Sequence, residues 1–153
     1  GFGSGVTCHT IDRGGQATYH APGQLVLYPV VHLGARGLGV RAFVWRLEEL
    51  MLELARACGI RAGRDARGHG VWTARGKLGA VGIRVREGIA THGLALNVSL
   101  DLAGYRLIAP CGMRDLPVTS LRAEGATLDV ADLLPNAERI PDGQYLLTHR
   151  QVR

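Results

Sequence analysis

A regular spacing of apolar residues stands out in the first half of the chain. Between residues 40 and 58, apolar side chains recur at helical spacing, while most charged side chains fall on the other faces. The apolar positions are Phe43, Leu47, Leu50, Met51, Leu54 and Cys58. This spacing predicts a helix over 40–58, and Gly59 is a natural C-terminal stop for it. Because free cysteine is among the most buried residue types, we expect Cys58 to pack in the core.

A second pattern predicts two antiparallel strands joined by a tight turn. Residues 83–86 alternate strictly between apolar and charged side chains, and Glu87-Gly88 is typical of a hairpin turn. A return strand follows over residues 89–100. The apolar side chains expected on one face of that strand are Leu94, Leu96 and Val98.

The remaining elements are shorter and less regular. The apolar run 25–31 predicts a strand, in which Pro29 is more typical of an edge or a bulge. Loose alternation over 6–12 predicts another short strand, and 71–73 predicts a third. The basic, glycine-bearing segment 61–70 is interpreted as a surface loop.

The last third of the chain carries weaker patterns. A short helix is expected around residues 128–134, and residues 136–153 are expected to form a weakly ordered tail. One long helix among several strands and hairpins predicts an α+β domain, a mixed β-sheet flanked by helices. With 153 residues, the chain 1–153 fits a single domain that can bury a real core.

Composition narrows the classes of partner and compartment. The 22 glycines follow no fixed period, which favours tight turns and close backbone approaches. A net charge of +5 favours an acidic partner, but the scattered arginines make nucleic acid a weak hypothesis. No apolar run is long enough to span a bilayer, and three cysteines without paired spacing indicate a reducing compartment. We therefore expect a cytoplasmic protein that binds neither nucleic acid nor membrane.

The segment from Arg13 to Tyr28 has the composition of a binding loop that runs into a strand. Gly14, Gly15 and Gly23 permit positive φ or a close approach of the backbone to a ligand. The donors and acceptors between these glycines are supplied by Thr18, Tyr19, His20 and Gln24.

Two residues are the leading candidates for chemistry. Cys111 lies between Pro110 and Gly112, a setting that can hold a thiol at a sharp turn, although it is also compatible with an inert loop cysteine. Lys77 is the only lysine among 18 basic residues, which indicates either a site that needs an amine able to lose a proton or chance retention.

The histidines are weaker candidates. His92 follows a strand and is compatible either with a position in a cleft or with a hydrogen-bonded place in the scaffold. Four further histidines show no metal-ligand spacing with cysteines or carboxylates, so no metal site is expected. They are His9, His32, His69 and His149.

Four segments together resemble the signature of the lipoyl(octanoyl) transferases, which move an octanoyl group from acyl carrier protein to lipoate-dependent enzymes. They occur in the family's order and cover roughly residues 6–121. The segments are Arg13-Gly14-Gly15 with Thr18-Tyr19-His20, Gly23-Gln24 and Tyr28; then Lys77-Leu78-Gly79-Ala80-Val81-Gly82; then His92-Gly93-Leu94-Ala95-Leu96-Asn97-Val98; then Ile108-Ala109-Pro110-Cys111-Gly112.

The resemblance implies a fold shared with biotin protein ligases and lipoate ligases, and an acyl-thioester intermediate on a cysteine. It implies no cofactor. Its implied partners are octanoyl-acyl carrier protein, the lipoyl domains of 2-oxoacid dehydrogenase complexes and the glycine cleavage H protein. Cys111 falls on the family's acyl-accepting nucleophile, and Lys77 falls on the lysine that favours the thiolate of that nucleophile. The positions that line the family's acyl pocket fall on Arg13, Gly14, Gly15, Gln16, Ala17, Thr18, Tyr19, His20, Ala80, Val81, Gly82, Gly93, Leu94 and Ala95.

The chain also departs from the family pattern. Ala21 replaces the glycine that usually follows the histidine. Family members carry a further helix and strand ahead of Val6, so the resemblance implies that this chain lacks the family's amino-terminal segment. Two alternatives stay open: an ATP-dependent lipoate or biotin ligase on the same fold, and a truncated, non-catalytic remnant that binds acyl chains.

Overall fold

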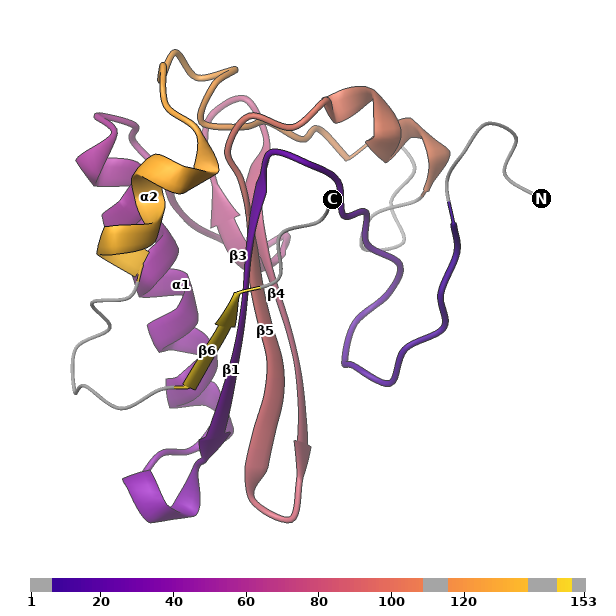
Figure 1. The fold of residues 1–153 in the computed structure, drawn as a ribbon, viewed down its shortest axis with the longest axis vertical. Coiled ribbons are helices and arrows are strands. Elements are labelled where there is room, and N and C mark those ends of the chain that lie inside the picture. The colour runs from indigo at the N-terminus through magenta and orange to yellow at the C-terminus, as the bar shows by residue number, and fades with distance from the viewer. Residues whose placement is uncertain (1–6, 109–115, 138–145, 150–153) are drawn as a thin grey trace.

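The described residues form one antiparallel sheet with two α-helices on one face (Figure 1). The computed structural model describes residues 7–108, 116–137 and 146–149. The elements are β1 (Gln24–His32), η1 (Gly34–Arg36), α1 (Val40–Ala57), β2 (Gly63–Asp65), β3 (Gly68–Trp72), β4 (Lys77–Arg86), β5 (Ile89–Asn97), η2 (Leu102–Leu107), α2 (Val130–Ala137) and β6 (Leu146–His149). The strand order is β2-β3-β4-β5-β1-β6, and the α+β class predicted from the sequence is confirmed, although the described strand pairs are all antiparallel where a mixed sheet was expected.

Helix α1 confirms the helical periodicity. Its apolar stripe, which includes Phe43, Met51 and Leu54, is buried against the sheet, and each such side chain contributes about 1.5–3 kcal/mol by burial. The helix ends where Gly59 adopts φ 74° and its N–H donates to the carbonyl of Arg56 at 2.9 Å. Cys58 packs against the core, as expected, and burial raises the pKa of its thiol.

The hairpin of β4 and β5 is also confirmed. Arg86 pairs with Ile89 across a two-residue turn in which Glu87 and Gly88 have φ of 51° and 78°. Two successive positive φ values are the mark of a type I′ turn, whose twist matches the flanking strands. The buried side chains of β5 that belong to the core are Ala90, Leu94 and Leu96, and Val98 follows them beyond the strand end.

Pro29, expected at an edge or a bulge, instead interrupts the ladder of the inner strand β1 with β5 without a bulge, because the register is the same on both sides of it. Pairs are formed at Leu27 with Leu94 and at Val31 with Ala90, but the ladder is interrupted between them, where this register sets Pro29 opposite His92. Proline has no N–H to donate, so the ladder cannot continue there. On its other side, β1 pairs with the short strand β6.

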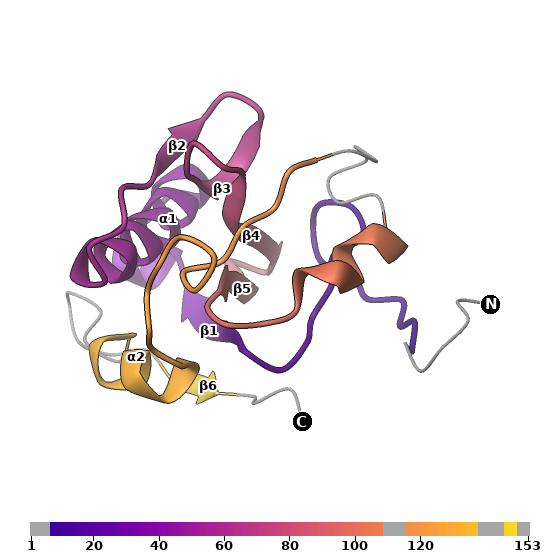
Figure 2. The same cartoon turned by 90° about the horizontal axis from the view of Figure 1, so that it is seen from above.

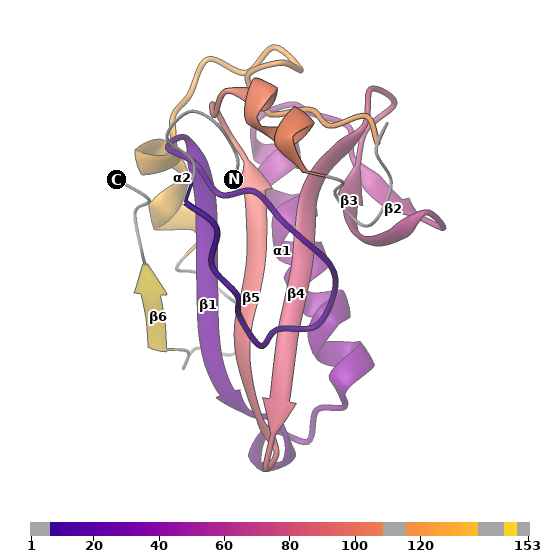
Figure 3. The same cartoon turned by 90° about the vertical axis from the view of Figure 1, so that its right-hand side faces the viewer.

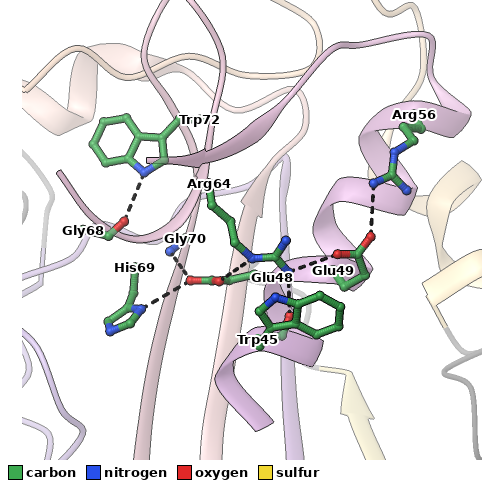
Figure 4. A network of polar contacts seen from close by, with 9 residues as sticks. All are labelled: Trp45, Glu48, Glu49, Arg56, Arg64, Gly68, His69, Gly70 and Trp72. Carbon is green, nitrogen blue, oxygen red and sulfur yellow. Dashed lines mark hydrogen bonds and ion pairs between the residues drawn. The ribbon is translucent and has the colours of Figure 1, made fainter. Parts of the chain in front are cut away.

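Two expectations about strands are wrong. Residues 7–12 have no regular structure, and residues 61–70 are not a loop because they contain β2 and the start of β3. The hairpin of β2 and β3 is held by Glu48 from α1, whose carboxylate accepts from the N–H of Gly70 and the Nε of Arg64, both at 2.9 Å (Figure 4). The local sequence gives no sign of these contacts, because Arg64 and Gly70 lie 16 and 22 positions after Glu48.

The chain has three layers, seen edge-on in Figure 2. Helices α1 and α2 form one layer and the sheet the next. The third layer consists of residues 7–23 and the 3-10 helix η2, on the face of the sheet opposite the helices. It is tied to the sheet at Gly14, whose N–H donates to the carbonyl of Ile83 in β4 at 2.9 Å. Among the residues described, no helix has the length and apolar character needed to cross a bilayer.

Candidate active site

A cavity of about 90 Å³ lies under the segment 13–20, which crosses the open face of β1, β5 and β4 in Figure 3. Among the described residues, the segment 13–20, β1, β4, β5 and η2 contribute to it, and Val118 also lines it. The lining residues are Arg13, Gly15, Gln16, Ala17, Thr18, His20, Tyr28, Lys77, Gly79, Ala80, Gly82, Gly93, Leu94, Ala95, Asn97, Tyr105 and Val118.

The floor of the cavity is made of small residues on two neighbouring strands. Ala80 of β4 pairs with Ala95 of β5, and Gly82 pairs with Gly93. These four positions leave the sheet backbone uncovered, which gives an extended apolar ligand close contact with it. A Cβ atom at Gly82 would lie 3.0 Å from the Cδ of Arg13, so the glycine also allows the loop to approach the sheet.

The loop above this floor is folded onto itself by Arg13. Its guanidinium donates to the carbonyl of Gly14 at 2.9 Å and to that of Gln16 at 2.6 Å. Gly15, between them, has φ 91°, a conformation that favours glycine. The side chain of Arg13 therefore shapes the loop and also brings a positive charge to the cavity.

Lys77 begins β4 and is buried, with 6% of its surface exposed. Its Nζ lies 5.0 Å from the ring centroid of Trp72, a cation–π distance. The indole is oriented by its own hydrogen bond, from Nε1 to the carbonyl of Gly68 at 3.2 Å. The hairpin that Glu48 holds (Figure 4) thus supplies the aromatic wall beside Lys77.

Cys111 lies outside the described residues, but the chain on either side of it borders the cavity. Before it, Tyr105 of η2 lines the cavity, and after it Val118 does so. The returning chain is pinned to β4 by two backbone bonds of Lys77: its N–H donates to the carbonyl of Pro117 at 2.8 Å, and its carbonyl accepts from Thr119 at 3.0 Å.

A buried polar network runs from His20 to the sheet. His20 Nδ1 lies 2.6 Å from Gln24 Oε1, and Gln24 Nε2 donates to Asn97 Oδ1 at 2.9 Å. Asn97 Nδ2 donates to the carbonyl of Thr119 at 2.9 Å, and the hydroxyl of Tyr105 donates to Asn97 Oδ1 at 3.0 Å. Burial lowers the pKa of His20 and Arg13 adds to this effect, while the hydrogen bond to Gln24 opposes it.

His92 is a second histidine beside the cavity, held in an unusual backbone conformation. Its φ is 59°, uncommon for a residue with a side chain, and it occupies the break in the β1–β5 ladder opposite Pro29. Its ring meets Tyr28 edge to face at 5.6 Å, and its Nε2 lies 3.3 Å from Asp12. Burial lowers its pKa, with smaller contributions from two neighbouring arginines.

The electrostatic character of the cavity is positive. Arg13 and Lys77 line it, and no carboxylate is found among its described lining residues. Such a site favours a thiolate or a developing oxyanion over the neutral group. Within residues 7–108, 116–137 and 146–149, no three histidine, cysteine or carboxylate side chains are grouped as they would be around a metal ion.

Most of the residues predicted from the sequence surround this one cavity. Of those that the structure describes, three do not line it: Gly14 bonds to β4, Tyr19 meets Tyr105 edge to face at 5.4 Å, and Val81 packs against the core. The lining residues that the sequence-based site left out are Tyr28, Gly79, Asn97, Tyr105 and Val118. Tyr28, Gly79 and Asn97 lie within the recognised segments, so the resemblance could have suggested them. The sequence around Tyr105 and Val118 does not indicate a place in the site, because only the tertiary fold brings these residues to the sheet.

Comparisons with known proteins agree with this arrangement. Residues 3–138 match the family model described as the lipoyl protein ligase A/B catalytic domain. The octanoyltransferase of Desulfotalea psychrophila is 46% identical over 125 residues, which cover 80% of this chain and 56% of that protein. The mitochondrial octanoyltransferase LIP2 of Arabidopsis thaliana is 44% identical over 138 residues, covering 89% of this chain and 56% of the relative. The chain therefore spans a little over half the length of these relatives.

A solved structure supports the fold. A structure described as that of a lipoate protein ligase from T. acidophilum, with bound lipoic acid, superimposes with a TM-score of 0.60. The match covers 84% of this chain and 54% of the other, and at 15% identity it bears on the fold alone. The fold predicted from the resemblance is confirmed, and the protein belongs to the lipoyl protein ligase A/B catalytic domain family.

Proposed function

We propose that this protein transfers an octanoyl group from octanoyl-acyl carrier protein to a lysine amine of lipoyl domains, through a thioester on Cys111. The acceptors are the lipoyl domains of 2-oxoacid dehydrogenase complexes and the glycine cleavage H protein. The observation that carries the proposal is the burial of Lys77 in a cavity floored by alanine and glycine, because this places one amine beside a slot for an acyl chain. The relatives named octanoyltransferases support the same activity.

The position of Cys111 along the chain is compatible with a role at this cavity. Six positions separate it from Tyr105 (111 − 105) and seven from Val118 (118 − 111), and both of these residues line the cavity. Even a fully extended chain keeps the thiol within about 25 Å of each, and any bend brings it closer. The described chain on either side of Cys111 thus reaches the cavity that Lys77 lines, which supports the proposal.

In the first half of the reaction, the Cys111 thiolate attacks the carbonyl carbon of the carrier's thioester. The bond from that carbon to the carrier sulfur breaks, and the carrier leaves as its thiolate. The positive charge of Lys77 favours the attacking thiolate, and the apolar floor holds the chain. In the second half, the amine of the acceptor lysine attacks the new thioester, so that an amide forms and Cys111 is released.

The charge of the molecule suits these partners. A net charge of +5 favours the docking of acidic proteins and speeds their encounter. The expected association is therefore salt-dependent, weakening as ionic strength rises.

Intact-mass spectrometry tests the transferase. The chain is incubated with octanoyl-acyl carrier protein without ATP, as wild type and as Cys111→Ala, with Cys58→Ala as the matched control. We expect one octanoyl adduct on wild type and on the control, and none on Cys111→Ala. If no adduct forms, or if Cys111→Ala also becomes acylated, the thioester mechanism is wrong. An acyl transfer that needs free octanoate and ATP would instead identify a ligase.

A second variant tests Lys77. Lys77→Arg keeps the charge but replaces a compact ammonium with a larger planar group in a buried position, so we expect most of the acylation rate to be lost. An acylation rate close to that of wild type would mean that positive charge alone is sufficient at this position.

A further inference from the structure

The hydrogen bonds of the buried network have only one consistent direction. The carbonyl of Thr119 can only accept, so the atom of Asn97 that lies 2.9 Å from it must be the amide nitrogen. This turns Asn97 Oδ1 toward Gln24, whose Nε2 donates to it at 2.9 Å. Gln24 Oε1 is then the atom that faces His20 at 2.6 Å, and an amide oxygen cannot donate. His20 Nδ1 must therefore carry the hydrogen.

Fixing one nitrogen of an imidazole defines the other. In neutral histidine, a hydrogen on Nδ1 leaves a lone pair on Nε2, which can accept a proton. The lowered pKa of His20, caused mainly by burial, favours this neutral form. His20 lines the same cavity as Lys77, so a ring with a defined proton acceptor borders the place proposed for the acyl chain.

We infer that His20 is the base that accepts the proton of the acceptor amine in the second half-reaction, and that Gln24 and Asn97 are positioning residues that hold its tautomer. The inference rests on the proposed function. The amine nitrogen forms the amide bond to the acyl carbon, and the bond from that carbon to Cys111 Sγ breaks. The proton lost by the nitrogen passes to His20 Nε2 and from there to the thiolate. Lys77 then serves the first half-reaction by its charge.

Three groups at or beside the cavity fit this role less well: Arg13, Tyr105 and His92. The titratable and charged side chains that line it besides His20 are Arg13, Tyr28, Lys77 and Tyr105. An arginine does not deprotonate, and the hydroxyl of Tyr105 is already committed to the network, donating to Asn97 and accepting from Gln24 at 3.1 Å. His92 has its Nε2 directed at the carboxylate of Asp12.

The two half-reactions separate this role from a structural one. His20→Asn keeps a donor for Gln24 near the position of Nδ1 but has no base at Nε2. We expect its octanoyl-enzyme to form within about 3-fold of the wild-type rate and to pass the chain to a lipoyl domain about 100-fold more slowly. Gln24→Met removes the acceptor that holds the tautomer, and we expect an intermediate loss, about 10-fold, in the transfer step. His32→Asn, at the exposed far end of β1, is the matched control and leaves both rates unchanged.

The pH dependence gives a signature that misfolding would not produce. In the ratio of the wild-type transfer rate to that of His20→Asn, the effect of pH on the acceptor amine cancels, because both proteins use the same acceptor. We expect this ratio to be constant near neutral pH and to fall in acid, where His20 becomes protonated and can no longer accept a proton. A ratio that does not change with pH, or a variant that slows both half-reactions equally, overturns the inference.

A spectroscopic measurement tests the tautomer without any activity. Nitrogen-15 NMR of the histidine rings distinguishes the Nδ1–H form from the Nε2–H form. We expect His20 to be in the Nδ1–H form in wild type and to shift toward the other in Gln24→Met. An Nε2–H form in wild type overturns the inference, whereas a missing acyl-enzyme in wild type contradicts the proposed function instead.

Discussion

Replacing Gly93 with alanine tests whether the floor of the cavity needs glycine. A Cβ atom at this position would overlap the carbonyl oxygen of Leu27 and lie 2.6 Å from the Cδ of Pro29, both in β1. Neither obstacle is the end of a flexible side chain, so β1 and β5 must separate to admit the methyl group. The same two strands carry Tyr28 and Ala95 of the cavity.

The size of the effect follows from these contacts. Forcing a methyl group into a packed position with no free rotamer to yield costs about 1–3 kcal/mol. The matched control is Gly63→Ala in β2, where a Cβ would meet nothing within 4 Å. A control without a clash is expected to stay within about 0.5 kcal/mol of wild type. Urea denaturation followed by circular dichroism measures both free energies of unfolding.

A steric requirement for glycine at position 93 is refuted if the two variants have the same stability. It would also be refuted if Gly93→Ala were stabilised, because this would mean that the strands have room for a side chain at the break in the ladder. We expect the octanoyl adduct of Gly93→Ala to form more slowly as well, since the methyl group would displace strands that line the cavity.

Three further predictions concern one buried and two partly buried ionisable groups. Glu48→Gln should lower the free energy of unfolding by about 1–2 kcal/mol, which is less than the loss expected for a fully buried ion pair, because its arginine partner is partly exposed. The control Glu53→Gln, on the exposed side of α1, should have no effect. Equal urea midpoints for the two variants would contradict this prediction. Cys58, whose pKa is raised by burial, should react with N-ethylmaleimide more slowly than the exposed Cys8. Peptide mapping after brief labelling measures both rates, and equal labelling would contradict the packing of Cys58 against the core. Because the folded state lowers the pKa of His20, this histidine is protonated at a higher pH in the unfolded chain than in the folded one, so stability should fall as pH drops below about 6.5. His20→Asn should reduce that fall, as urea denaturation at a series of pH values would show; an unchanged pH dependence would contradict the prediction.

Elements that depend on nearby residues were predictable. The stripe of α1, its stop at Gly59 and the turn at Glu87-Gly88 all rest on contacts between neighbours in the chain. The interruption at Pro29 was also foreseeable, because a missing N–H acts wherever the residue is placed.

Elements that depend on distant partners were not predictable. The hairpin of β2 and β3 was interpreted as a loop because its stabilising carboxylate, Glu48, comes from a helix earlier in the chain. Residues 7–12 alternate like a strand but pair with none, since the sheet gives β4 and β5 other neighbours. His92 adopts its positive φ only where β1 and β5 meet at Pro29.

The candidate site divides in the same way. The sequence by itself identified the residue types, because a lone lysine, a cysteine between proline and glycine, and a glycine-rich loop are local facts. The tertiary structure decided which of these meet in space, placing Lys77, His20 and the alanine-glycine floor around one cavity. It also decided the direction of the hydrogen bonds from Thr119 to His20. The backbone carbonyl of Thr119 sets this direction, and it becomes a neighbour of Asn97 only when the chain has folded.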